Sequence, residues 1–239
     1  MNRGTQSVLR LDGSSEFEGE WDPRVLADLL TGEDLDFWKG RRVLDIGGNT
    51  GGLSLELARR GASVTISEPD PYKNSIAKTE RIIRRSAVDE GLNLEIADAD
   101  LFHCHELDRH DTVLCLGLLY HFRHPQLVVD YLSALEPEWL FISSQTHPSD
   151  DLALFNRAHL GILGRGHLPD DTVLTGWHPT RALLVRMLEW AGFDTPISLT
   201  ADRYDFPKKL PGATNSSYYK AKLLRPVNVE EASRAYLPR

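Results

Sequence analysis

The stretch Arg41–Asp70, RRVLDIGGNTGGLSLELARRGASVTISEPD, decides the fold. Its apolar run at 43–46 predicts a strand buried on both faces, and a glycine-rich turn at 47–52 follows directly. Leucine and alanine then favour a helix that ends near Gly61, and residues 64–66 predict a second buried strand. Strand, turn, helix and strand in this order predict a βαβ unit of an α/β protein.

This unit predicts a site for a nucleoside-like ligand. A glycine turn adopts positive φ and lets a ligand approach the backbone, while the start of a helix offers N–H groups. Glu68 lies 17 positions after Gly51, at the tip of the neighbouring strand, where a carboxylate can accept both hydroxyls of a ribose. The alternative is a plain tight turn with Glu68 as a solvated strand end. The acid at this distance favours the ligand site.

The motif Asp45-Ile46-Gly47-x-Asn49-x-Gly51 resembles the first motif of class I S-adenosylmethionine-dependent methyltransferases, hh(D/E)hGxGxG. The third glycine of a dinucleotide fingerprint is not in register, and Asn49 replaces the usual middle glycine of the methyltransferase motif. The resemblance implies a Rossmann-like α/β fold, with a seven-stranded, mostly parallel sheet, helices on both faces and an antiparallel last strand. It also implies one domain over 1–239, with S-adenosylmethionine as cofactor and S-adenosylhomocysteine as product.

Under this resemblance, the cofactor lies at the ends of four strands. The alternating residues 92–96 predict a third strand. The acid after this strand meets the adenine amino group in that superfamily, and Asp98 fits this role better than Asp100. A fourth buried strand at 112–116 leads into a turn whose carbonyls face the methionine part of the cofactor. The residues expected to bind cofactor are Asp45, Gly47, Asn49, Gly51, Glu68, Pro69, Asp98, Ala99, Leu116 and Gly117.

Tyr120 and His121 follow the fourth strand by four or five positions. Ligands of open α/β sheets lie at the carboxyl ends of strands, and a histidine there can take a proton near neutral pH. We therefore expect His121, with Tyr120, to be the catalytic base or to orient the acceptor. The alternative is that His121 only packs and forms hydrogen bonds under the cofactor.

Residues 118–125, LLYHFRHP, look like the LYHxxxP stretch of the tRNA wobble-uridine (carboxy)methyltransferase-like group. Trp21-Asp22 followed by 24–26, and the helix after His178, are also similar to that group. Two departures matter: the longer N-terminal helical region is absent, and no lysine precedes Lys39, although that group uses lysines to hold a carboxylated cofactor. We therefore favour ordinary S-adenosylmethionine and a small-molecule acceptor in secondary metabolism, methylated at oxygen, nitrogen or carbon. The alternatives are a tRNA wobble-uridine modifying enzyme and a non-catalytic cofactor-binding protein.

The segment 146–178 has the features of an insertion that covers the substrate. Long loops with their own glycines after a strand end are usually functional or disordered. A short helix is expected at 152–160, and residues 1–20 are polar enough to predict a flexible N-terminal arm. The residues expected to face substrate are Trp21, Phe155, His159, Trp177 and His178, although Trp21 serves equally well as an anchor for the helix that begins at Pro23.

Composition limits the partners and the compartment. A net charge of −8 over 239 residues disfavours broad nucleic-acid binding. Only two cysteines, Cys104 and Cys115, and no apolar leader predict a reducing, cytoplasmic setting. No stretch approaches the roughly 20 apolar residues of a membrane span. Three histidines at 103, 105 and 110 are too crowded to predict a metal site, and the sequence leaves a homodimer open.

Overall fold

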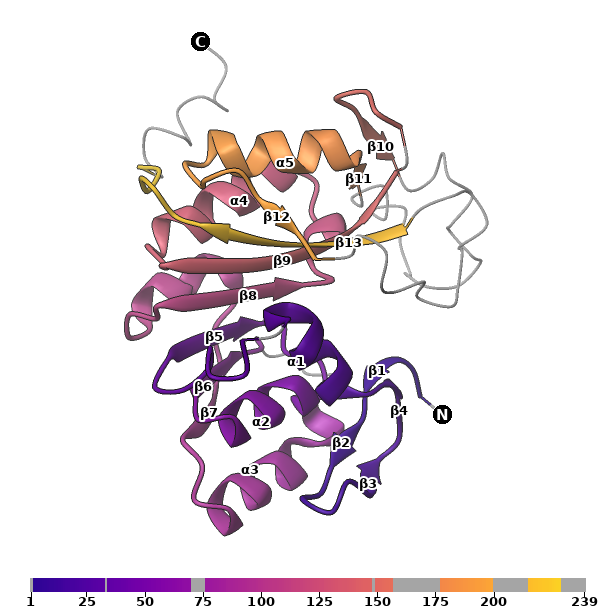
Figure 1. Ribbon diagram of the computed structural model, residues 1–239, viewed down its shortest axis with the longest axis vertical. Coiled ribbons are helices and arrows are strands. Elements are labelled where there is room, and N and C mark those ends of the chain that lie inside the picture. Colours follow the sequence, from indigo (N-terminus) through magenta and orange to yellow (C-terminus); the bar gives the residue numbers. More distant parts are fainter. Residues whose placement is uncertain are drawn as a thin grey trace. The chain divides into compact units, whose positions relative to one another are not determined.

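The computed structural model describes residues 2–32, 34–69, 76–147, 149–156, 177–199 and 215–228. Seven strands form one sheet in the order β12-β13-β9-β8-β5-β6-β7 (Figure 1). Their bounds are β5 Arg42–Ile46, β6 Ser63–Ser67, β7 Leu94–Ala97, β8 Thr112–Leu116, β9 Trp139–Thr146, β12 Ile197–Ser198 and β13 Asn215–Lys222. β5 runs parallel to β6 and β8, and β6 to β7, whereas β13 is antiparallel to β9 and β12. The predicted Rossmann-like sheet with its antiparallel last strand is confirmed.

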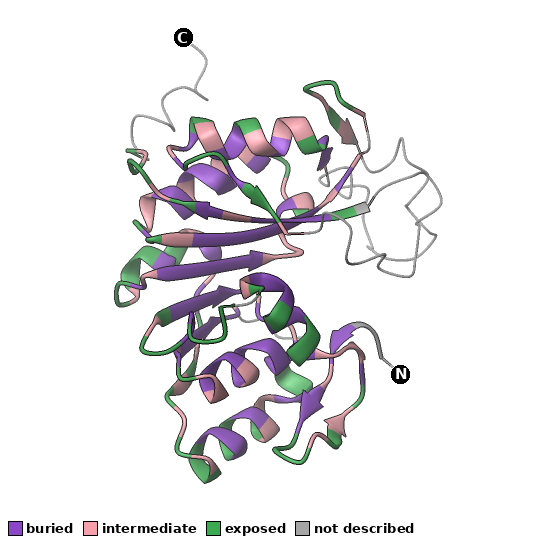
Figure 2. Ribbon diagram, in the orientation of Figure 1, coloured by how far each residue is buried: buried purple, intermediate pink, exposed green. Residues whose placement is uncertain are grey.

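The chain divides into two compact units, Met1–Leu114 and Cys115–Arg239. The single domain expected for 1–239 stays a prediction. Strands β5, β6, β8 and β9 are largely buried, as Figure 2 shows in purple, because their apolar runs have no polar alternation. The edge strand β7 is only partly buried, which agrees with its alternating sequence.

In the first unit, α2 (Gly52–Arg59) packs against β6 and β7 and against α1 (Pro23–Thr31) and α3 (Glu80–Asp89). Asp22 caps α1, because its carboxylate accepts a hydrogen bond from the Arg24 N–H at 2.9 Å. Two short 3-10 turns, η1 (Ile76–Lys78) and η2 (Leu101–Glu106), complete the helical elements that the structure describes here.

The segment 1–20, predicted as a flexible arm, contains strands from Asn2 onwards. β1 (Asn2–Gln6) pairs in parallel with β4 (Gly19–Trp21), and β2 (Val8–Leu9) pairs antiparallel with β3 (Ser15–Phe17). Val8 is fully buried in a core cluster with Leu55, Ile66 and two further isoleucines. These strands correct the expectation of a loose arm, because one buried valine in a polar stretch gave too weak an apolar signal.

In the second unit, α4 (Pro125–Ala134) packs against α5 (Arg181–Trp190), and η3 (Leu119–His121) follows β8. β10 (Leu154–Asn156) pairs antiparallel with β11 (Trp177–Pro179). The short helix expected at 152–160 is therefore wrong for its described part, because the backbone of 154–156 finds its partners across this strand pair. Residues 157–160 lie outside the described residues.

Candidate functional site

The turn after β5 is held in a left-handed backbone conformation at three positions. Gly47, Asn49 and Gly51 have φ of 70°, 59° and 74°. Asparagine tolerates this region better than other residues with a Cβ. The Asn49 Oδ1 accepts the Thr50 N–H at 2.9 Å, so its side chain folds back onto its own turn. Asn49 can thus stand where the motif has a second glycine.

Two glycines of the turn leave no room for a side chain. A Cβ on Gly48 would lie 2.7 Å from the Cγ2 of Ile66, and a Cβ on Gly51 would lie 3.1 Å from carbon atoms of both Ile76 and Ile83. The turn is therefore pressed onto β6 and the core behind it. These contacts fix its path.

Five backbone N–H groups of the turn and the helix start already donate hydrogen bonds within the protein. Gly47 donates to Ser67 O, Asn49 to the Glu68 carboxylate, Thr50 to Asn49 Oδ1, Gly51 to Gly48 O and Leu53 to Gln6 Oε1. This corrects the expectation that the helix start offers these groups to a ligand. A phosphate needs several such donors, so the arrangement favours a nucleoside without phosphates.

Two buried carboxyl groups lie at the ends of β5 and β6. Asp45 is 3% exposed, and burial raises its pKa to about 6 although the Ser54 hydroxyl donates to it at 2.5 Å. Glu68 is 9% exposed. Burial and then the charge of Asp45 raise the pKa of Glu68 to about 7, against the opposing hydrogen bond from the Asn49 N–H.

One oxygen of Glu68 is the clearest mark of a ligand site in the first unit. Its Oε2 is buried, and it has no hydrogen-bond partner in the part of the chain that the structure describes. A buried acceptor in this state costs free energy, and native proteins normally provide it with a donor. Ribose hydroxyls would supply that donor, so the residues present fit the predicted cofactor.

The end of β7 separates the two candidate acids for adenine. The Asp100 carboxylate accepts the N–H groups of Phe102 at 2.8 Å and of His103 at 3.1 Å, so it caps η2. Asp98 is exposed directly after the strand. Ala99 is buried, and its carbonyl accepts the Ser67 hydroxyl at 2.6 Å. Asp100 therefore acts as a helix cap, and the role of Asp98 as the adenine acid stays a prediction, as does the role of half-buried Pro69.

In the second unit, Tyr120 and His121, which are predicted to contact the methyl acceptor, follow β8, and the ring of His178 lies near Tyr120. The Gly117 N–H donates to Ser143 Oγ at 2.9 Å. The rings of Tyr120 and His121 lie 4.3 Å apart, and those of Tyr120 and His178 lie 5.8 Å apart. His121 is exposed, Tyr120 is half-buried and His178 is fully buried. An exposed imidazole beside a phenol suits proton transfer to or from a bound acceptor.

Tyr218 belongs to this cluster and was missed in the sequence. It lies opposite Ser143 in the β9–β13 pair, and the two hydroxyls share a hydrogen bond. Burial raises the pKa of Tyr218 to about 12, with a smaller contribution from Tyr120. Only the register of the antiparallel pair brings Tyr218 here. The sequence offers only one weak signal, an aromatic residue two positions before Lys220 and four before Lys222 in the last strand.

The remaining substrate candidates fall in three places. Phe155 and His147 stack with ring centroids 3.8 Å apart, and Phe155 pairs with His178 across β10 and β11. Trp177 is half-buried in β11, and Trp21 is half-buried in β4 of the first unit. His159 lies outside the described residues. The roles of these residues stay predictions.

Among the described residues, no group of three or more His, Cys, Asp or Glu is arranged to hold a metal ion. Cys104 and Cys115 are both buried thiols without a disulfide. Among the helices described, none has the length and apolar character that crossing a membrane requires.

A family model described as "Methyltransferase domain" matches residues 19–195. The chain belongs to this family. The match begins at β4 and extends past α5, so it includes the glycine turn, both buried carboxyl groups and the Tyr120–His121 pair. Membership of the methyltransferase family confirms the first resemblance seen in the sequence. The narrower resemblance to wobble-uridine enzymes stays a prediction.

Individual methyltransferases show how far the likeness extends. A ubiquinone biosynthesis O-methyltransferase of Aeromonas salmonicida (strain A449) is 30% identical over 127 residues, which are 50% of this chain and 50% of that protein. The N-terminal domain of EvdMO1, in the presence of SAH and D-fucose, gives a TM-score of 0.58 at 19% identity, over 92% of this chain and 91% of that one. Magnesium protoporphyrin IX methyltransferase of Synechocystis PCC 6803, with bound SAH, gives 0.55 at 21% identity, over 84% and 80%.

These likenesses differ in what they establish. The match to the Aeromonas enzyme spans about half the length of that curated relative. The solved structures, at 19% and 21% identity, establish the shared fold. The family therefore rests on the match over 19–195.

Proposed function

We propose that this protein is an S-adenosylmethionine-dependent methyltransferase that acts on a small molecule. The observation that carries the proposal is the buried Glu68 Oε2, which has no hydrogen-bond partner among the described residues, beside a turn in which the N–H groups of Gly47, Asn49, Thr50 and Gly51 are engaged. Such a site accepts hydroxyl donors and offers little to phosphate. Two solved structures with this fold support the same ligand class. The EvdMO1 domain was crystallised in the presence of SAH and D-fucose, and the magnesium protoporphyrin IX methyltransferase was crystallised with bound SAH.

When bound, S-adenosylmethionine supplies an electrophilic methyl group on a sulfonium, which needs no further activation as a leaving group. The chain contributes alignment and proton removal. Glu68 would accept the ribose hydroxyls, Asp98 would meet the adenine amino group, and the backbone of the turn at 47–51 would lie against the nucleoside. His121 takes the proton of the acceptor, and Tyr120 orients it.

A tRNA-modifying role is the second candidate, carried by the LYHxxxP stretch at 119–125. The net charge of −8 weighs against it, because tRNA binding needs a basic surface. A non-catalytic cofactor-binding protein is the third. A homodimer and a cytoplasmic location stay predictions from the sequence.

Calorimetric titration with S-adenosylmethionine, SAH, carboxylated S-adenosylmethionine and NADH, run in parallel, tests the proposal. We expect the first two to bind with dissociation constants of about 1–100 μM, which corresponds to about 5–8 kcal/mol. Tighter binding of the carboxylated form would move the tRNA role to first place. Binding of NADH alone, or of none of the four, would refute the proposed cofactor.

Transfer is tested next with methyl-labelled S-adenosylmethionine and a panel of phenols, amines, sugars and carboxylic acids. Label in a small-molecule product supports the enzyme. Cofactor binding without transfer to any panel member, together with labelled tRNA in a parallel reaction, would support the second candidate instead.

A further inference from the structure

Residues 5–9, here called the strap, lie across the glycine turn and the start of α2. Gln6 makes three hydrogen bonds to this region. Its side-chain Oε1 accepts the Leu53 N–H at 2.8 Å, its carbonyl accepts the Thr50 hydroxyl at 2.8 Å, and its N–H donates to Asn49 Oδ1 at 3.3 Å. Gln6 is 6% exposed, so these bonds are shielded from water.

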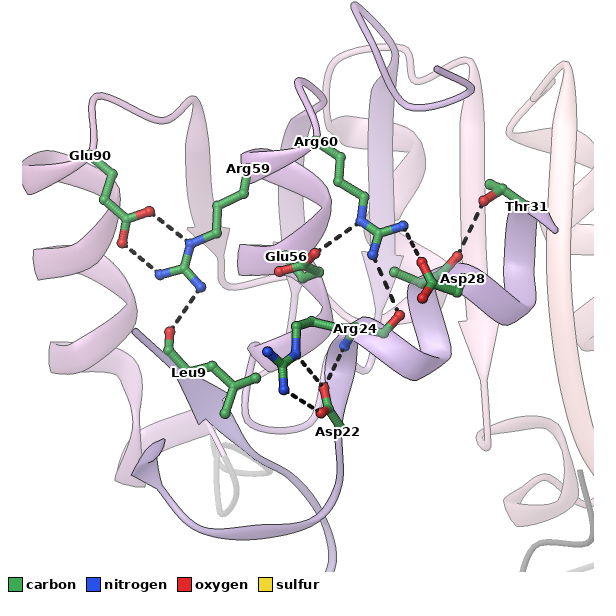
Figure 3. A network of polar contacts seen from close by, with 10 residues as sticks. Leu9, Asp22, Arg24, Asp28, Thr31, Glu56, Arg59, Arg60 and Glu90 are labelled. Carbon is green, nitrogen blue, oxygen red and sulfur yellow. Dashed lines mark hydrogen bonds and ion pairs between the residues drawn. The ribbon is translucent and has the colours of Figure 1, made fainter. Parts of the chain in front are cut away.

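The strap approaches α2 as closely as a backbone can. A Cβ on Gly52 would lie 2.1 Å from the carbonyl oxygen of Ser7, so the first residue of the helix must lack a side chain. At the other end of α2, an Arg59 nitrogen donates to the Leu9 carbonyl at 2.8 Å (Figure 3). Arg59 is itself fixed by two hydrogen bonds to Glu90, at 2.6 and 2.7 Å.

Between these two ends the strap is anchored in the core. Val8 is 0% exposed to solvent, and it packs with Leu55 of α2 and Ile66 of β6. Burying one valine contributes about 1.5–3 kcal/mol, enough to hold a short segment in place. The burial of Val8 therefore holds the strap in place in addition to the contacts that Gln6 makes.

We propose that Gln6 is a positioning residue for the cofactor. The backbone N–H of Gln6 donates to the Asn49 side chain, and the backbone N–H of Asn49 in turn donates to the Glu68 carboxylate. The side chain of Gln6 fixes this arrangement by accepting the Leu53 N–H, so it acts on the ribose acceptor through the position of its own backbone and of Asn49. Its neutral amide also occupies the Leu53 N–H, a donor that would otherwise attract an anion. This inference rests on the proposed function and assigns a determinant of cofactor affinity to the strap.

Two substitutions of Gln6 separate its hydrogen bond from its bulk. Gln6→Met keeps the length of the side chain but removes the acceptor of the Leu53 N–H, the side-chain bond that keeps the Gln6 backbone N–H against Asn49. We expect S-adenosylmethionine affinity to fall about tenfold, the effect of one lost buried hydrogen bond. Gln6→Glu keeps an acceptor at the helix start, where a negative charge is favourable, so affinity should stay within about threefold of wild type.

Ser7→Ala is the matched control. The Ser7 hydroxyl accepts the Gly19 N–H at 3.0 Å, so this change weakens the pairing of the strap with β4 while leaving the Gln6 contacts intact. We expect Ser7→Ala to lower the unfolding temperature without changing cofactor affinity. A purely structural role of Gln6 would instead make affinity follow the unfolding temperature in all variants.

Gly52→Ala tests the same contact from the helix side. Alanine is favoured over glycine within a helix, but its methyl group would displace the Ser7 carbonyl and with it the strap. We expect a loss of affinity similar to that of Gln6→Met. Because both changes release one contact, their effects should not add in the double variant.

The outcomes are distinct. Wild-type protein that fails to bind S-adenosylmethionine overturns the proposed function and this inference together. Wild-type binding with unchanged affinity in both Gln6→Met and Gly52→Ala overturns this inference alone. If Gln6→Met does not fold, Gly52→Ala decides: weakened binding in a folded protein supports the strap, and unchanged binding rejects it.

Discussion

Glu68 is the residue that would accept the ribose hydroxyls of the proposed ligand, and its burial destabilises the folded protein when no ligand is bound. Its carboxyl group is buried near Asp45, and its pKa is raised from 4.5 to about 7. Between these two values the folded protein holds a proton that the unfolded chain has released. The unfolding free energy of the cofactor-free protein should therefore fall as pH rises from about 5 to above 7. Asp45, with its pKa raised to about 6, adds to this trend at lower pH.

Glu68→Gln removes this titration and keeps the side-chain shape. We expect the variant to unfold at higher urea concentration than wild type at pH 8, and the difference to shrink at pH 5. Its S-adenosylmethionine affinity should fall at least about tenfold, because a neutral amide accepts ribose hydroxyls more weakly than a carboxylate. Urea melts at both pH values and calorimetry measure these effects. Equal pH dependence in the two proteins would contradict the burial argument.

His121 is the exposed base candidate, in contact with the Tyr120 ring. For the acceptor identified in the transfer screen, we expect His121→Ala to lower turnover by about 10²–10⁴-fold, the usual contribution of a general base. Cofactor affinity should change by less than about twofold. His124→Ala, an exposed histidine of the same stretch, is the control. Unchanged turnover in His121→Ala would remove it from the catalytic role.

At the level of the elements, the β5–α2 turn depends on Gly51. Its φ of 74° disfavours any side chain, and an added Cβ would press on three isoleucines at 3.1–3.2 Å. We expect Gly51→Ala to lower the unfolding free energy by about 2–4 kcal/mol, the sum of backbone strain and overpacking. Gly91→Ala is matched in backbone, with φ of 66°, but has nothing within 4 Å and should cost only about 1 kcal/mol. Equal losses in urea denaturation would refute the packing contribution.

Local patterns in the sequence were enough for the elements whose partners are near in the chain. The turn at 47–52 and the acid at Glu68 belong to one strand-helix-strand run, so spacing alone predicted them. Gln6 and Tyr218 escaped because their partners, Leu53 and Ser143, lie 47 or more positions away. The register of distant strands is set by packing, which leaves little trace in a polar segment such as 1–20.

For the whole molecule, the net charge of −8 bears on the choice between a small-molecule acceptor and tRNA. We expect no binding of total tRNA by fluorescence anisotropy at about 0.15 M salt, where electrostatic attraction between exposed groups is screened beyond about 8 Å. A basic RNA-binding protein of similar size serves as the positive control. Binding that weakens steeply as salt rises would indicate a local basic surface and restore the tRNA role.

The strap also bears on how the chain reaches its native state. Gln6 cannot form its bond to Leu53 until α2 has been synthesised, 47 residues later. Chains emerge at about 5–20 residues per second, so the first strand waits for seconds after leaving the ribosome tunnel. During that interval Val8 has no core to enter. The turn at 47–51 should thus reach its final geometry only when the strap packs against it.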